Sequence, residues 1–179
     1  MKRLLVVVDM QNDFIDGSLG TKEAKKIVDN VVAKIQSYEQ NHDEVVYTLD
    51  THDEDYLRSQ EGRNLPVIHC IKGEKGWLLH NKIEENSNKN KKCFEKGIFG
   101  SFDLANYIQQ GNYNQIELIG VCSDICVISN ALIVKSFIPE LKIKVDASCC
   151  AGVTVEKHLA ALEVMKSCQI DVINEYMGN

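Results

Sequence analysis

Residues 3–9 read RLLVVVD: an unbroken run of apolar side chains over residues 4–8, followed directly by a carboxylate. A strand with one face in water alternates apolar and polar residues. An unbroken run rich in β-branched residues is instead typical of a strand buried on both faces. Such strands occur in parallel sheets that helices cover on both sides. The run therefore predicts an α/β fold.

The rest of the chain alternates strand patterns with helix patterns. Strands are expected at residues 44–50, 92–96, 115–121, 142–147 and 171–174, and helices at residues 21–40, 101–111, 124–138 and 154–167. Ser101 and Thr154 are the expected helix caps, and residues 51–92 form a long polar stretch. We predict a three-layer αβα sandwich with a mostly parallel, Rossmann-like sheet. No repeat or linker divides the 179 residues, which predicts a single domain over residues 1–179.

Composition and charge exclude several classes of function. The net charge is −6, and the basic residues are scattered apart from a short run at residues 89–92, so we expect no nucleic-acid partner. No apolar run is long enough for a membrane span, and polar residues interrupt the N-terminal run too early for a signal peptide. We therefore expect a cytoplasmic protein with no membrane partner, in which the seven cysteines are free.

In open parallel sheets, ligands bind beyond the carboxyl ends of the strands. Asp9, Asp50 and the residues after Gly120 all lie at such ends. A carboxylate directly after a buried run, as at Asp9, is costly unless it is solvated, paired or hydrogen-bonded. Position alone favours a helix or turn cap as much as a catalytic role.

Two cysteines follow the strand at residues 115–121. Cys126 lies at the start of the predicted helix, where free N–H groups and the helix dipole favour the reactive thiolate. Cys122 precedes it in the turn from strand to helix. The pattern indicates nucleophilic catalysis, but a redox or metal pair, or two buried thiols, would produce the same spacing.

The polar stretch holds candidate metal ligands. Asp50 and His52 face one way if the strand continues, and Glu61 and His69 follow. Carboxylate and imidazole ligands suit Zn²⁺, Mn²⁺ or Fe²⁺. The alternative is that both histidines are ordinary polar loop residues. An EF-hand is a poor match: the spacing from Asp50 to Glu61 fits, but the segment lacks the glycine and the series of oxygen ligands of that loop.

Together these segments resemble the isochorismatase-like cysteine hydrolases, and within them the nicotinamidases. LLVVVDMQNDF is similar to the family's opening strand, with Asp9 as the catalytic aspartate. FEKGIFGSF is similar to the segment of the catalytic lysine, Lys96, and IGVCSDICV to the nucleophile motif, with Cys126 as the nucleophile. LDTH and PVIHCIKGEKGW resemble the nicotinamidase metal segment, which implies Asp50, His52 and His69 as ligands.

The resemblance implies the isochorismatase-like hydrolase fold and an acyl transfer. It implies a cis peptide between Val121 and Cys122, so that the backbone N–H groups of Cys122 and Cys126 form an oxyanion hole. Lys96 and the helix terminus would hold Cys126 near its thiolate, while Asp9 moves protons and a thioester forms and is hydrolysed.

The implied substrate is a small amide, first of all nicotinamide. A divalent metal, Zn²⁺ first and Mn²⁺ or Fe²⁺ as alternatives, would orient it, with Glu61 as the candidate fourth protein ligand and Ser59 or water as alternatives. Phe14 is the expected ring-stacking residue, and Leu19 is a further pocket residue. By analogy with the family we also expect a homo-oligomer.

Two departures from the nicotinamidase pattern bear on the substrate. Leu65 stands before Pro66 where those enzymes usually have tryptophan, and Thr51 stands where an aromatic residue is usual. They favour a related hydrolase of another small amide, a ureido compound or isochorismate as the second hypothesis. A degenerate member that serves as a binding or scaffold protein is the third.

Overall fold

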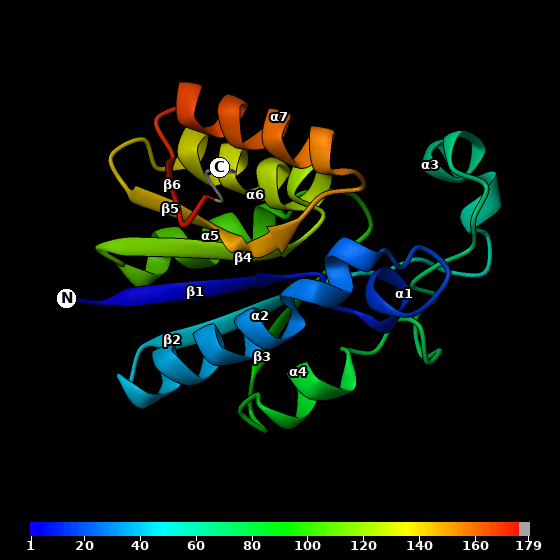
Figure 1. Cartoon of the computed structure of the whole chain (residues 1–179), viewed down its shortest axis with the longest axis horizontal. Coiled ribbons are helices and arrows are strands. Elements are labelled where there is room, and N and C mark those ends of the chain that lie inside the picture. Colours follow the sequence, from blue (N-terminus) through cyan, green and yellow to red (C-terminus); the bar gives the residue numbers. More distant parts are fainter. Residues whose placement is uncertain (176–179) are drawn as a thin grey trace.

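The computed structural model describes residues 1–175; residues 176–179, the end of the predicted domain, lie outside the described residues. Within the described part, six strands form one parallel sheet in the order β3-β2-β1-β4-β5-β6 (Figure 1). The strands are β1 (Arg3–Val8), β2 (Glu44–Asp50), β3 (Lys92–Lys96), β4 (Gln115–Val121), β5 (Lys142–Ala151) and β6 (Asp171–Ile173). The predicted α/β sandwich is confirmed, and where a mostly parallel sheet was expected every described strand pairing is parallel.

Helices cover both faces of this sheet (Figure 1). One face packs against α1 (Asn12–Ile15), α2 (Lys22–Gln40) and α4 (Asn81–Glu85), and the other against α5 (Phe102–Gly111), α6 (Ile128–Phe137) and α7 (Val155–Ser167). In β1, Leu4 and Val6 belong to the core beneath α5–α7, whereas Leu5 and Val7 belong to the core beneath α2. Both sides of β1 are buried, which explains its unbroken apolar run.

The predicted caps of two helices are present. The Ser101 hydroxyl accepts a hydrogen bond from the Leu104 N–H at 3.1 Å, and the Thr154 hydroxyl accepts one from the Lys157 N–H at 3.2 Å. Each satisfies a backbone N–H that has no partner inside the helix. No helix among residues 1–175 is long and apolar enough to cross a membrane.

Three segments differ from the prediction. The polar stretch after β2 contains the short helices η1 (Tyr56–Arg58), α3 (Gln60–Asn64) and α4. The helix expected at residues 124–138 is a π-helical turn, η2 (Ser123–Val127), followed by α6. β5 continues to Ala151, beyond the predicted end at residue 147. Its register with β4 shifts between Leu118 and Gly120, and after this irregular stretch the two strands pair again.

Candidate active site

The carboxyl ends of three strands, β1, β3 and β4, bring three predicted catalytic side chains together. Asp9 follows β1, Lys96 ends β3, and Cys126 lies in η2 after β4. Lys96 Nζ lies 2.7 Å from Asp9 Oδ2 and 3.5 Å from Cys126 Sγ. All three residues are buried. The site therefore combines a carboxylate, an ammonium and a thiol in one buried cluster.

Asp9 does not cap a helix or turn through its side chain, so that alternative is wrong. Its carboxylate accepts a hydrogen bond from the Thr48 hydroxyl at 2.6 Å, and its other oxygen contacts Lys96. Helix α1 begins after Gln11 instead. The backbone of Asp9 is left-handed, with φ 49°, a conformation that costs energy in a residue other than glycine and recurs at functional sites.

Burial dominates the protonation of this cluster. It raises the pKa of the Asp9 carboxyl, with the Lys96 charge opposing the shift. Burial and then the Asp9 charge raise the pKa of the Cys126 thiol well above its usual value, and Lys96 offsets only part of this. Burial opposes the charged form of Lys96, but Asp9, Cys126 and Asp50 raise its pKa, so it keeps its proton. These shifts disfavour the resting thiolate that the resemblance implied, because burial destabilises the anion by more than the Lys96 charge stabilises it.

The turn that carries Cys126 has a defined backbone. The peptide between Val121 and Cys122 is cis, as the resemblance implied. The Cys122 carbonyl accepts hydrogen bonds from the N–H groups of Ile125 and Val127, at 3.1 and 3.0 Å. The Asn130 amide donates to the Cys126 carbonyl at 2.8 Å. These bonds hold the residues whose N–H groups are the candidate oxyanion donors.

Four predicted metal ligands form a second cluster beside the first. One ligand atom from each lies within 4.8 Å of the other three: Asp50, His52, Glu61 and His69. Asp50 Oδ2 is 3.0 Å from His52 Nε2 and 3.4 Å from His69 Nε2, and Asp50 Oδ1 is 3.2 Å from Lys96 Nζ. Within residues 1–175 this is the one group of three or more such ligands, and neither Cys122 nor Cys126 belongs to it.

The chemistry of these donors suits a divalent cation. His69 Nδ1 lies 2.7 Å from the Val67 carbonyl, an arrangement that leaves Nε2 free to bind a metal. Glu61 Oε2 is buried and has no hydrogen-bond partner among the described residues. The Ser59 hydroxyl instead accepts the Gly62 N–H at 2.9 Å and caps α3, which favours Glu61 over Ser59 as a ligand.

The charges of the cluster agree with this. Burial disfavours the Asp50 carboxylate, yet hydrogen bonds from His52 and His69 lower its pKa overall. Burial and the nearby Asp50 charge raise the pKa of Glu61. A cation between these groups would stabilise both carboxylates.

Known proteins show similarity along nearly the whole chain. A family model described as the isochorismatase domain matches residues 3–175. This chain belongs to the isochorismatase family. A relative from Bacillus subtilis strain 168, described as the uncharacterized isochorismatase family protein PncA, is 30% identical over 173 residues, which span 90% of this chain and 93% of the relative.

Two solved structures extend the family comparison. The nicotinamidase/pyrazinamidase PncA from Bacillus subtilis has a TM-score of 0.86 and 29% identity, covering 97% of this chain and 100% of that one. The pyrazinamidase of Pyrococcus horikoshii, solved in complex with zinc, has a TM-score of 0.85 and 25% identity, covering 98% of this chain and 100% of that one.

In this isochorismatase-family chain, a cavity of about 270 Å³ adjoins both clusters. Phe14 and Leu19, the two predicted pocket residues, both line it. The Phe14 ring packs edge-on against His69, with ring centroids 5.7 Å apart. Leu65, which stands where nicotinamidases usually have tryptophan, also lines it. Sequence reasoning missed five other lining residues: Thr21, Phe99, Ile125, Val153 and Lys157. Of these, Phe99 and Ile125 lie within the quoted family segments, a signal that could have found them.

Gln11 is a further residue that sequence reasoning missed. Its side-chain amide donates to the Asp50 and Trp77 carbonyls, both at 2.8 Å, and its oxygen accepts the Asp50 N–H at 2.8 Å. It is fully buried. Gln11 therefore fixes the backbone of a candidate metal ligand, and its place in the segment DMQNDF could have pointed to it.

Proposed function

We propose that this chain is a metal-dependent cysteine amidohydrolase that converts nicotinamide and water to nicotinate and ammonia through a thioester on Cys126. The observation that carries the proposal is the contact of one buried ammonium, Lys96, with Asp9, Cys126 and Asp50 beside the cavity. It joins a nucleophile, a base and a candidate metal cluster in one site. Family membership supports hydrolysis of an amide C–N bond.

In the first half-reaction, Asp9 accepts the thiol proton as Cys126 Sγ bonds to the amide carbon. The carbonyl oxygen becomes an oxyanion, which accepts hydrogen bonds from the N–H groups of Cys122 and Cys126. Asp9 then gives its proton to the amide nitrogen, the C–N bond breaks, and ammonia leaves. A Cys126 thioester remains.

In the second half-reaction, Asp9 takes a proton from water while the water oxygen bonds to the thioester carbon. The C–S bond breaks, and the Cys126 sulfur recovers the proton from Asp9. The product leaves as the carboxylic acid and becomes nicotinate when its remaining proton passes to the solvent. Lys96 keeps its positive charge throughout and stabilises the anionic forms of Asp9 and Cys126. Burial raises the pKa of the Cys126 thiol, which is consistent with proton transfer to Asp9 as the sulfur attacks.

Asp50, His52, Glu61 and His69 would hold the divalent metal, with Zn²⁺ the first candidate and Mn²⁺ or Fe²⁺ the others. When bound, it would supply Lewis-acid attraction for the ring nitrogen of the substrate or a bridging water. Phe14 and the apolar lining would exclude water and orient the ring.

The deciding experiment measures ammonia release from nicotinamide by metal-loaded wild type and Cys126→Ala. We expect turnover in the wild type and none above background in the variant. Cys93→Ala, which changes an exposed cysteine of β3 that does not line the cavity, is the matched control and should turn over like the wild type. Wild-type turnover no greater than that of Cys126→Ala would refute the proposal.

A second candidate function is hydrolysis of another small amide, a ureido compound or isochorismate. Leu65 lines the cavity where a nicotinamidase tryptophan is expected, and the Thr51 hydroxyl accepts the Trp77 indole N–H at 2.9 Å. A preparation loaded under metal-replete conditions that binds no divalent ion would favour this candidate. Absence of both amidase activity and iodoacetamide reactivity at Cys126 would favour a binding or scaffold role.

We further propose a cytoplasmic enzyme of NAD salvage that acts as a homo-oligomer, without nucleic-acid or membrane partners. All seven cysteines are free, as expected in a reducing compartment. Sedimentation of the purified protein tests the oligomeric state, and a monomer at micromolar concentration would contradict that part of the proposal.

A further inference from the structure

The turn that carries the nucleophile is held from two sides. On one side Asn130, at the start of α6, donates to the Cys126 carbonyl and accepts the Ser101 N–H at 3.0 Å. On the other side the connection from β5 to α7 supplies one bond and α7 itself a second. The Val153 N–H donates to Asp124 at 3.0 Å, and Ser123 Oγ lies 2.8 Å from His158 Nδ1.

The Ser123–His158 bond is the more deeply buried of these two contacts. Ser123 is fully buried, whereas Val153 is exposed. A buried hydroxyl that loses its partner costs about 1–3 kcal/mol, so the turn would rearrange if the imidazole were removed. Packing beside it is tight: a Cβ on Gly152 would come within 2.9 Å of the His158 backbone nitrogen.

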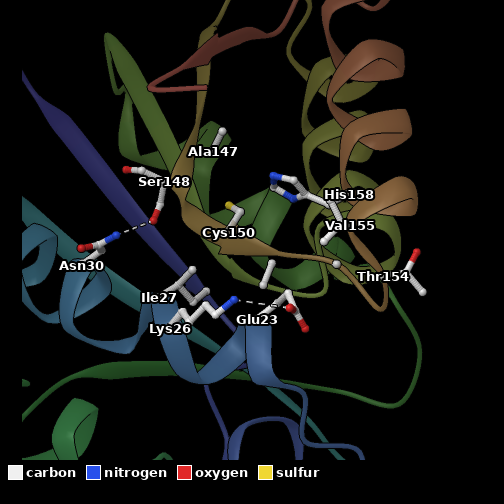
Figure 2. Close-up of a pocket in the computed structure, with 12 residues that line it drawn as sticks. Glu23, Lys26, Ile27, Asn30, Ala147, Ser148, Cys150, Thr154, Val155 and His158 are labelled. Atoms are coloured by element: carbon white, nitrogen blue, oxygen red, sulfur yellow. Dashed lines mark hydrogen bonds and ion pairs between the residues drawn. The ribbon is translucent and has the colours of Figure 1, made fainter. Parts of the chain in front are cut away.

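Residues 153–158, at the start of α7, line two cavities. Val153 and Lys157 line the catalytic cavity. Thr154, Val155 and His158 line a second hollow of about 430 Å³, which lies between the start of α2, the end of β5 and α7 (Figure 2). Figure 2 shows the His158 ring projecting from α7 on the side of Cys150. His158 does not line the catalytic cavity, so it can act on the chemistry only through Ser123.

We infer that His158 is a positioning residue, which through Ser123 holds the Cys122 N–H and the Cys126 sulfur in place at the catalytic cavity. This inference rests on the proposed cysteine chemistry. Oxyanion donors and nucleophiles act only within a narrow geometry, and a misplacement of about 1 Å can cost on the order of 10²-fold in rate. Substrate binding would change little, because His158 does not reach the cavity.

Two replacements of His158 can separate the loss of its hydrogen bond from the loss of its volume. In asparagine, the side-chain amide occupies about the place of His Nδ1 and can hydrogen-bond to Ser123 Oγ. Leucine has similar volume but no polar atom. We therefore compare His158→Leu, His158→Asn, Ser123→Ala and the double variant His158→Leu with Ser123→Ala, all checked for folding by circular dichroism and thermal unfolding.

We expect kcat for nicotinamide to fall roughly 10-fold or more in His158→Leu and in Ser123→Ala, with KM changed less than about threefold. The double variant should lose no more than the worse single variant, because both changes remove one bond. His158→Asn should recover most of the lost kcat. A folded His158→Leu variant with kcat within twofold of wild type, additive losses, or a His158→Asn variant as impaired as His158→Leu would overturn the inference.

A second readout does not depend on the substrate. We expect iodoacetamide to label Cys126, followed by peptide mass spectrometry, several-fold more slowly in His158→Leu than in wild type, because the displaced thiol loses its contact with the base. His158→Asn should label at nearly the wild-type rate. If nicotinamide is not hydrolysed, this difference still supports the role of His158, and equal labelling rates in the three proteins overturn it.

Discussion

At the scale of single residues, Lys96 shows how the site depends on a buried charge. Its ammonium contacts Asp9, Asp50 and Cys126, and the residue is 5% exposed. Two buried carboxylates would repel each other without this cation between them. The same contacts that would support catalysis therefore also stabilise the fold.

Lys96→Met is expected to lower kcat on the order of 10²-fold or more and to destabilise the protein by about 3 kcal/mol, because breaking a buried ion pair leaves a charge without compensation. Urea unfolding and ammonia release measure the two effects. Lys92→Met, an exposed position on the same strand, is the control and should cost about 1 kcal/mol or less, from the loss of its cation–π contacts with Phe94 and Tyr107. Equal stability of the two variants would contradict the argument.

The metal cluster yields a second prediction for single residues. Glu61→Gln should weaken zinc binding on the order of 10²-fold or more, because it removes a charged ligand. Ser59→Ala removes the α3 cap but no proposed ligand, so its zinc affinity should stay within about tenfold of wild type. Competition with a zinc indicator measures both, and the reverse ranking would make Ser59 the ligand.

At the scale of elements, the close approach of β1 and β4 shapes the catalytic edge. Gly120 has φ +117°, and a Cβ there would lie 2.1 Å from the Val8 carbonyl oxygen. It precedes the cis peptide of the nucleophile turn and faces the irregular stretch in β5. Only glycine lets β4 pass so near β1 while it turns into η2.

Gly120→Ala is therefore expected to cost at least about 3 kcal/mol of unfolding free energy, from backbone strain plus a backbone clash. Gly73→Ala is a matched control, since Gly73 has φ +85° but nothing within 4 Å of the added Cβ, and should cost about 1–2 kcal/mol. Denaturant unfolding compares them. If both variants lose the same free energy, the clash plays no part.

At the scale of the whole molecule, a buried ion network ties the longest helix to the sheet. Lys34 of α2 contacts Glu117 of β4 at 2.7 Å and Asp146 of β5 at 2.6 Å. Asp146 also accepts hydrogen bonds from Ser148 and Asn174. Burial disfavours the Asp146 carboxylate, but the Lys34 hydrogen bond and these others lower its pKa overall.

A group whose pKa is lowered by folding stabilises the protein above its unfolded pKa, about 3.9 for aspartate, and that contribution is lost as the pH falls through the lower folded value. We expect Lys34→Met to lower the free energy of unfolding by about 2–4 kcal/mol at pH 7. This gap between variant and wild type should narrow below about pH 4. Urea unfolding at pH 7, 5, 4 and 3 measures the gap. For Lys82→Met, which removes an exposed pair with Asp29, a gap of about 1 kcal/mol or less is expected at pH 7. A gap for Lys34→Met that persists unchanged at pH 3 would contradict the role of Asp146.

Local pattern alone determined much of this protein. The unbroken run in β1, the alternation of strands with helices, and the caps Ser101 and Thr154 follow from periodicity and backbone hydrogen bonding, which act over a few residues. Because strands of a parallel sheet share one carboxyl edge, the nearness of Asp9, Asp50 and the turn after Gly120 also followed from the sequence.

Tertiary structure decided the remainder. The extension of β5, the raised pKa of the Cys126 thiol and the bond from His158 to Ser123 all depend on packing between segments far apart in the chain. No short window of sequence contains such contacts, because burial and dielectric arise only when the layers assemble. Periodicity thus selects the elements and their order, and assembly sets the charge state and precise placement of the groups they carry.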